Sequence, residues 1–258
     1  VVAYIFVGGF VAVVWSDFFQ GLLMFAGLLA LPLVAYFAID HSGDIYGTLE
    51  SIDPNLVNIW GAFDDPWMQA ASMLGFAFIG LGSLGSPQVY VRFISVKDTK
   101  EIDKGKWVAI AFTLITDAAA VSIGLLARYL LTDVGQDPES ILGVSGEGSL
   151  MALLNATFPA FIISIYIAII LSAIMSTIDS LLVVASSAIT RDLYQKVFRP
   201  NVTSKKLSKI SGRVTVIMAL LALALAMVVA IAVPGRTVFW FTIFGWSGIA
   251  ATFCPMII

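Results

Sequence analysis

The chain has 258 residues, of which 59% are hydrophobic and only 12% are charged, and its mean hydropathy is +0.97. A soluble domain carries about 25% charged residues, so the composition excludes a soluble globular protein and predicts an all-α integral membrane protein. The apolar runs are continuous rather than alternating, which argues against a transmembrane β-barrel, and a single Cys and a single His give no support to a disulfide or to a His- or Cys-based metal site.

Six full membrane spans are expected, because a helix needs about 20 apolar residues to cross the bilayer. Residues 1–13 are expected to be the tail of an earlier helix, closed by a Gly8-Gly9 connection. The fourth span is longer than the bilayer requires, so it should tilt or continue into the cytoplasm. Both ends of the sequence are apolar, so we expect a fragment of a larger protein. The six spans are 14–38, 67–91, 107–131, 158–188, 210–233 and 238–258.

The loops between the spans differ in charge. Most basic residues lie in the connections 92–106 and 189–213, whereas the connections 39–66 and 132–157 are acidic. The positive-inside rule places the basic loops in the cytoplasm, and this assignment alternates correctly across all six spans. The segment 147–158 in the last acidic loop predicts a short helix on the outer surface.

The middle of the fourth span is unusually polar. Ala173, Ser176, Thr177 and Ser180 stand at i, i+3, i+4 and i+7, which is one face of a helix, and Asp179 borders that face. A carboxylate at mid-bilayer costs roughly 3 kcal/mol, so it usually faces an ion path or a polar cavity. Clustered oxygen atoms suit a hard cation. The alternative is that these hydroxyls bond to their own helix or to a neighbouring one.

Two more carboxylates lie in or against spans. Asp17 follows Ser16 where the first span opens, so it can cap that helix, and capping is compatible with ion binding. Asp117 lies inside the third span and is expected to make a polar contact between helices.

Glycine and proline crowd the inner half of the second span, at Gly80, Gly82, Gly85 and Pro87. These residues weaken a helix and let its backbone face a cavity. Transporters place substrate sites at such interrupted helices. Close packing through small residues is the alternative.

Three runs of the sequence resemble the sodium/solute symporter family, closest to its sodium/proline symporter branch. The runs are GGFVAVVWSDFFQGLLMF (8–25), GLGSLGSPQVYVRF (80–93) and SAIMSTIDSLLVVASSAITRDLYQKVF (172–198). The resemblance implies a leucine-transporter-like bundle of two inverted repeats. The chain would then be one transmembrane domain, 1–258, running from the end of core helix four through core helix ten.

The resemblance also implies two sodium sites. The family's conserved site matches the carbonyl of Ala173 and the hydroxyls of Ser176 and Thr177. A second site, present in some members, matches Asp17 together with Ser176, Asp179 and Ser180. Asp179 stands where other members often have a hydroxyl, so the two carboxylates could bind sodium more tightly or hold a proton between them.

The solute site implied by the resemblance lies on core helix six. Ile79 and Ser83 stand where proline transporters present aromatic residues, and Gly82 and Pro87 belong to the same interrupted helix. That departure leaves another small amino acid or an organic anion open as the substrate.

The sequence therefore predicts a sodium-coupled symporter that imports a small organic solute across the plasma or inner membrane, which it crosses several times. Its expected partners are the solute, the co-transported sodium ion and the lipid bilayer, with no nucleic acid and no enzymatic chemistry. Two alternatives stay open: a solute-sensing module of a signalling protein, and a proton-coupled transporter that uses Asp17 and Asp179.

Overall fold

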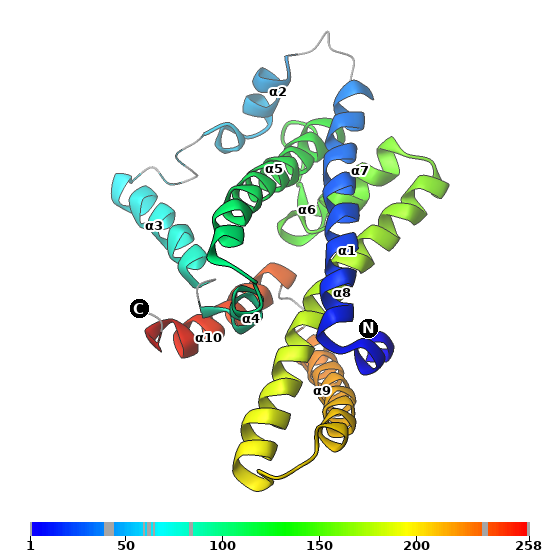
Figure 1. The fold of residues 1–258 in the computed structure, drawn as a ribbon. Coiled ribbons are helices and arrows are strands. Elements are labelled where there is room, and N and C mark those ends of the chain that lie inside the picture. The colour runs from blue at the N-terminus through cyan, green and yellow to red at the C-terminus, as the bar shows by residue number, and fades with distance from the viewer. Residues whose placement is uncertain are drawn as a thin grey trace. The chain divides into compact units, whose positions relative to one another are not determined.

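The computed structural model describes residues 2–38, 44–58, 60, 63, 65–82, 85–233 and 237–256. Every regular element in these ranges is helical (Figure 1). In chain order the elements are α1 (Val2–Ala38), α2 (Ile45–Ile52), η1 (Pro54–Leu56), α3 (Pro66–Gly82), α4 (Pro87–Ile94), α5 (Thr99–Leu131), α6 (Glu139–Leu142), η3 (Val144–Gly146), α7 (Ser149–Thr157), α8 (Ala160–Ser187), η4 (Ala188–Phe198), α9 (Ser204–Ala232), α10 (Val238–Phe253) and η5 (Cys254–Met256).

Four helices in the described ranges are long and apolar enough to cross a membrane, which confirms an all-α membrane protein. They are Phe10–Ala38, Thr99–Leu131, Ala160–Phe198 and Ser204–Ala232. The predicted last span is shorter than expected, since α10 ends at Phe253 and a 3₁₀ turn containing Pro255 follows. The expected short outer helix is also present, as α7.

The first helix corrects the expected break at Gly8-Gly9. Its backbone is helical from Val2 to Ala38, with Pro32 inside it. Glycine costs only about 1 kcal/mol relative to alanine inside a helix. Breaking the helix in an apolar medium would instead leave several backbone groups without partners, at a cost of several kcal/mol each. The helix therefore continues through the pair.

The second predicted span is two helices, not one. α3 ends at Gly82, and α4 begins at Pro87 with Ser86 as its N-cap residue (Figure 1). Proline at the first helical position is favoured because its missing N–H would have no intrahelical partner there. The same proline cannot continue α3, since its ring clashes with the preceding turn.

The fourth span continues beyond its predicted end. After Ser187 the chain stays helical to Phe198, but residues 188–198 adopt the wider π-helical form. Lys196 Nζ binds Asp192 Oδ1 at 2.7 Å on this extension. The added turns account for the excess length that the sequence indicated.

The chain divides into two compact units. One comprises residues 1–24 and 168–236, and the other comprises 25–167 and 237–258. In the first unit Val13 and Leu182 form a small buried cluster, with Val183, Met218 and Ala219 packed against it.

The larger core lies in the second unit, where helices α1, α5, α7 and α8 meet. Tyr166 is buried in this core, stacks on Phe158 with 5.4 Å between the ring centroids, and donates its hydroxyl hydrogen to the carbonyl of Gly27 at 3.2 Å. The buried members of the core are Leu31, Ala35, Ile123, Leu126, Ala127, Leu142, Leu153, Leu154 and Tyr166.

Candidate functional site

The polar cluster of the fourth span lies in the first unit, and Asp17 of α1 reaches it. Asp17 Oδ2 is 3.2 Å from Ser180 Oγ, although the two residues are 163 positions apart. Val13 lies one helical turn before Asp17 and packs with Leu182 and Val183 of α8. The apolar contact therefore holds the two helices at the level where their polar side chains meet.

Two hydroxyls of this cluster bond to carbonyls of their own helix. Ser176 Oγ donates to the Ala173 carbonyl at 2.8 Å, and Ser180 Oγ is 2.8 Å from the Ser176 carbonyl. A hydroxyl has one hydrogen and two lone pairs. Each serine can thus donate to the helix and still offer lone pairs to a cation. The Ala173 carbonyl oxygen already accepts a hydrogen bond from the Ser176 hydroxyl. An ion bound to that oxygen would have to share it with this hydrogen bond.

Asp179 is fully buried, with 0% of its surface exposed, and Ser180 beside it is 7% exposed. No other Asp, Glu, Lys or Arg in the described ranges is buried to this degree. A buried carboxylate requires hydrogen-bond donors, a cation or a proton to offset the loss of water. Asp179 and half-buried Asp17 therefore place two carboxylates beside a part of α8 that is largely shielded from water.

Two other polar residues singled out from the sequence, Thr177 and Asp117, are exposed rather than buried. Thr177 is exposed on α8, and its hydroxyl makes no hydrogen bond to another described residue, so its oxygen is available to a ligand. Asp117 is exposed on α5. The expected polar contact from Asp117 to a neighbouring helix is not formed among the described residues.

A second site lies in the other unit, where α3 packs against α10. A cavity of about 270 Å³ is lined there by Ile79 and Gly82 of α3 and by Trp246 and Ser247 of α10, together with Gly75, Phe78, Ile243 and Ala250. Cavities that hold drug-sized ligands span roughly 300–1,000 Å³. A space of this size suits a small solute.

Small residues allow the two helices to come this close. A Cβ added to Gly82 would lie 3.2 Å from the Cβ of Ala250. One added to Gly85 would lie 2.9 Å from the sulfur of Cys254 and 3.0 Å from its backbone nitrogen. The packing interpretation and the cavity interpretation therefore both apply to Gly82, whereas Gly85 follows the end of α3 and only the packing interpretation applies to it.

The predicted solute residues divide into three groups. Ile79 and Gly82 line the cavity. Pro87 does not line it and instead begins α4. Ser83 lies outside the described residues. Sequence reasoning missed Trp246 and Ser247, although an aromatic and a hydroxyl residue between Gly245 and Gly248 in an apolar helix is a recognisable signal.

Comparison with known proteins gives a consistent result. The model of the family described as "Sodium:solute symporter family" matches residues 1–258. The chain is 34% identical over 264 residues to the high-affinity proline transporter PutP of Bacillus subtilis (strain 168), covering 100% of this chain and 51% of that protein. It is 30% identical over 262 residues to the osmoregulated proline transporter OpuE of the same organism, covering 100% of this chain and 49% of OpuE.

A third relative is the sodium/proline symporter of Escherichia coli (strain K12), at 27% identity over 264 residues, with coverage of 100% of this chain and 49% of the relative. The chain thus spans about half the length of the curated relatives it matches. No solved structure gives a significant match.

Proposed function

The chain belongs to the sodium:solute symporter family, and from this premise we propose that it forms the central part of a sodium-coupled symporter. The protein imports a small organic solute, such as proline, another small amino acid or an organic anion, by alternating access. The relatives described above carry the names of transporters and symporters, which supports transport rather than enzymatic chemistry. Residues 1–258 act as one transmembrane domain that contains the end of core helix four through core helix ten.

The observation that carries this proposal is the contact between Asp17 and Ser180. It joins α1 to α8 through oxygen atoms, 3.2 Å apart, directly beside the fully buried Asp179. Oxygen ligands from carboxylates, hydroxyls and carbonyls are those that a hard cation prefers. A monovalent cation between these groups would offset the repulsion between two carboxylates.

Two sodium positions share Ser176 in this proposal. The first uses the Ala173 carbonyl with the hydroxyls of Ser176 and Thr177, and the free hydroxyl of Thr177 supports it. The second uses Asp17, Asp179 and Ser180, again with Ser176. Each of the two serine hydroxyls keeps lone pairs on its oxygen after it donates its hydrogen to its own helix. In this proposal those lone pairs bind the ions.

Sodium couples to transport through the two helices it bridges. An ion bound to Asp17 on α1 and to Ser180 on α8 favours the conformation in which these side chains are close. A ligand shifts a conformational equilibrium only by its difference in affinity for the two states. Sodium therefore promotes the outward-open state to the extent that this state brings the two residues together.

The solute occupies the cavity between α3 and α10. Ile79 and Gly82 on one side, and Trp246 on the other, give it a mostly apolar wall, and the hydroxyl of Ser247 adds a polar group to it. Ser83 follows Gly82 directly in the sequence and remains a proposed solute residue on that ground alone, and Pro87 begins α4 after the interruption of the helix. This arrangement fits a small amino acid with an apolar body.

Uptake measured as a function of sodium concentration tests the proposal. The full-length protein is reconstituted in liposomes, and entry of labelled proline is followed for the wild type, Thr177→Ala and Asp17→Asn. Both variants should need more sodium for half-maximal uptake, with a smaller change in the proline requirement at saturating sodium. Thr215→Ala is the matched control, because this buried α9 hydroxyl bonds only to the Ser211 carbonyl, at 3.0 Å, in the described structure.

Two results would count against this mechanism. If the sodium requirement of Thr177→Ala matches that of the control, the hydroxyl is not a ligand. If an imposed proton gradient drives uptake without sodium, and Asp17→Asn abolishes that uptake, the carboxylates carry protons and the proton-coupled alternative is correct.

A further inference from the structure

The connection between α8 and α9 contains seven of the fourteen basic residues of the chain. Residues 189–213, here called the basic hairpin, comprise most of η4, a short turn and the start of α9 (Figure 1). With one acidic residue among them, the segment has a net charge of +6. All seven basic side chains are exposed: Arg191, Lys196, Arg199, Lys205, Lys206, Lys209 and Arg213.

The other basic connection is largely neutralised by its own carboxylates. Residues 92–106 carry five basic and three acidic residues, which gives a net charge of only +2. Two ion pairs form there, Lys104–Glu101 at 3.3 Å and Lys106–Asp103 at 2.7 Å. In the basic hairpin, which the structure describes throughout, the one ion pair joins Lys196 to Asp192. The hairpin therefore keeps an excess of positive charge that none of its own residues neutralises.

Three of these charges follow one side of α9. Lys205, Lys209 and Arg213 are spaced four residues apart, so they are neighbours on the helix surface. Like charges at this spacing destabilise a helix, and the first turn of α9 contains no acidic residue. An anion bound along this side would remove the repulsion.

η4 adds exposed apolar side chains next to the charges. Leu193, Val197 and Phe198 are four and five residues apart, so they share one side of a helix with i→i+5 bonds. Val197 is 64% exposed and Phe198 is 65% exposed. A helix that combines an exposed apolar side with basic residues is typical of segments that lie in the headgroup region of a membrane.

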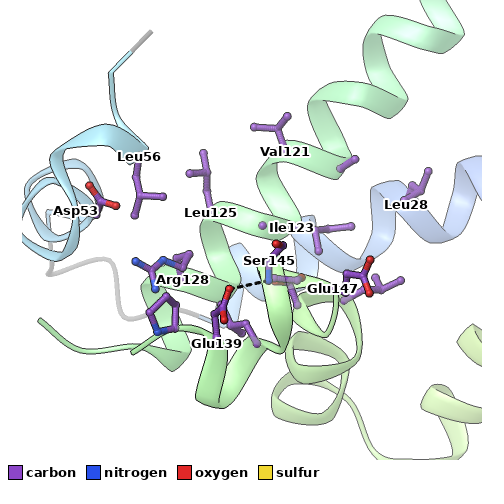
Figure 2. Close-up of a pocket in the computed structure, with 17 residues that line it drawn as sticks. Leu28, Asp53, Leu56, Val121, Ile123, Leu125, Arg128, Glu139, Ser145 and Glu147 are labelled. Atoms are coloured by element: carbon purple, nitrogen blue, oxygen red, sulfur yellow. Dashed lines mark hydrogen bonds between the residues drawn. The ribbon is translucent and has the colours of Figure 1, made fainter. Parts of the chain in front are cut away.

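The acidic connections carry the opposite charge. Asp53, Glu139 and Glu147 line one cavity beside α5 (Figure 2), and Arg128 is the only basic residue among its described lining residues. An anionic surface would be repelled there. Basic loops face the cytoplasm, and the cytoplasmic leaflet is the one that carries anionic lipids. The positive side of the chain therefore faces the negative leaflet.

We propose that the basic hairpin is a docking surface for anionic phospholipids of the cytoplasmic leaflet. Lys205, Lys209 and Arg213 bind the headgroup phosphates, and Val197 and Phe198 insert beside the start of the acyl chains. Lipid is favoured over an acidic protein because the hairpin directly joins two helices that can span the membrane, so a leaflet lies beside it. The surface is separate from the proposed sodium and solute sites.

Equilibrium binding of tritiated phosphatidylglycerol to the detergent-purified full-length protein tests this assignment. Unlabelled phosphatidylglycerol, phosphatidylcholine, glycerol 1-phosphate and poly-L-glutamate serve as competitors. Phosphatidylglycerol should displace the label about tenfold more effectively than phosphatidylcholine, or better, because each basic residue near a membrane surface strengthens the attraction to anionic lipid. The two soluble anions should compete less well than phosphatidylglycerol, because they have no acyl chains to place beside Val197 and Phe198.

Four variants separate the hairpin from positive charge in general. The triple variant Lys205→Gln/Lys209→Gln/Arg213→Gln should bind phosphatidylglycerol about tenfold more weakly, or worse, and lose the preference over phosphatidylcholine. Lys209→Gln alone should show a smaller loss, and Lys205→Arg/Lys209→Arg, which keeps both charges, should bind as the wild type does. The matched control removes three exposed lysines of the loop 92–106 and should keep the preference: Lys100→Gln/Lys104→Gln/Lys106→Gln.

Several results would overturn the proposal. One is an unchanged preference for phosphatidylglycerol in the hairpin triple variant, or in Lys209→Gln if the triple variant does not fold. Another is an equal loss in the control triple variant, since any cytoplasmic positive charge would then suffice. Competition by glycerol 1-phosphate that equals phosphatidylglycerol would indicate a site for a soluble anion, and stronger competition by poly-L-glutamate would indicate an acidic protein partner. Uptake is not measured in this test, so its failure leaves the proposed symport unaffected.

Discussion

Ser180 Oγ lies 3.2 Å from Oδ2 of Asp17 and 2.8 Å from the carbonyl oxygen of Ser176. The hydroxyl has one hydrogen, so it can point fully at only one of these two acceptors. A cation bound to Asp17 would repel that hydrogen and direct it to the helix carbonyl. The state of this hydroxyl is thus tied to whether the carboxylate holds an ion.

Replacing Ser180 by alanine should weaken sodium dependence. Hydrogen bonds to charged groups contribute about 1.5–3 kcal/mol, so the sodium concentration for half-maximal uptake should rise by roughly tenfold or more. Ser186→Ala is the control, since Ser186 is similarly buried on α8 but bonds to the Val183 carbonyl at 3.2 Å. Equal sodium curves for the two variants would show that Ser180 is only a packing residue.

Gly85 lies between the end of α3 and the start of α4, close to Cys254 just after α10, which makes this position sensitive to a single methyl group. Gly85→Ala should lower the thermal unfolding midpoint of the detergent-purified protein by several degrees, because the new Cβ would lie 3.0 Å from the backbone nitrogen of Cys254. Gly80→Ala should not lower it, since nothing lies within 4 Å of a Cβ there and alanine favours the helix. A midpoint for Gly85→Ala that equals the Gly80→Ala value would contradict the packing seen here.

Solute choice should depend on Trp246. Trp246→Ala enlarges the cavity between α3 and α10, so labelled proline should require a higher concentration for uptake, while larger amino acids should compete better than before. Trp240→Ala removes an exposed indole from the same helix that does not line the cavity. If both variants show the same competition profile, the cavity does not hold the solute.

Orientation in the membrane can be read by thiol labelling of intact cells, after Cys254 is replaced by serine. A cysteine at exposed Lys100, in the first basic loop, should resist an impermeant maleimide. A cysteine at Val134, which is 67% exposed in an acidic loop, should react. The opposite labelling pattern would reverse the assignment of inner and outer faces.

The sequence predicted the helical fold well because the signals were long. Apolar runs and loop charges can be recognised from local composition alone, without knowledge of tertiary contacts. They were sufficient to locate the four long helices and the α7 segment. The same reasoning failed at Gly8-Gly9, where two glycines usually signal a break. In an apolar medium the cost of unpaired backbone groups exceeds the helix penalty of glycine, so α1 continues.

The candidate sites were predictable only in part. Residues clustered within one helix, such as Ser176 and Ser180, reveal themselves by spacing. Spacing within one helix cannot identify a partner on another helix. The contact of Asp17 with Ser180 was expected only from the resemblance to a family, and neither spacing nor that resemblance pointed to Trp246.

The π-helical end of α8 carries a mechanical consequence. Over residues 188–198 each backbone N–H reaches one residue further back than in an α-helix. If a turn there reverted to α-helical bonding, every residue after it would change its angular position about the axis by roughly 100°, the angle of one residue in an α-helix. A one-residue shift in the hydrogen-bonding pattern of this segment would therefore rotate the connection to α9 about the axis of α8 without bending α8.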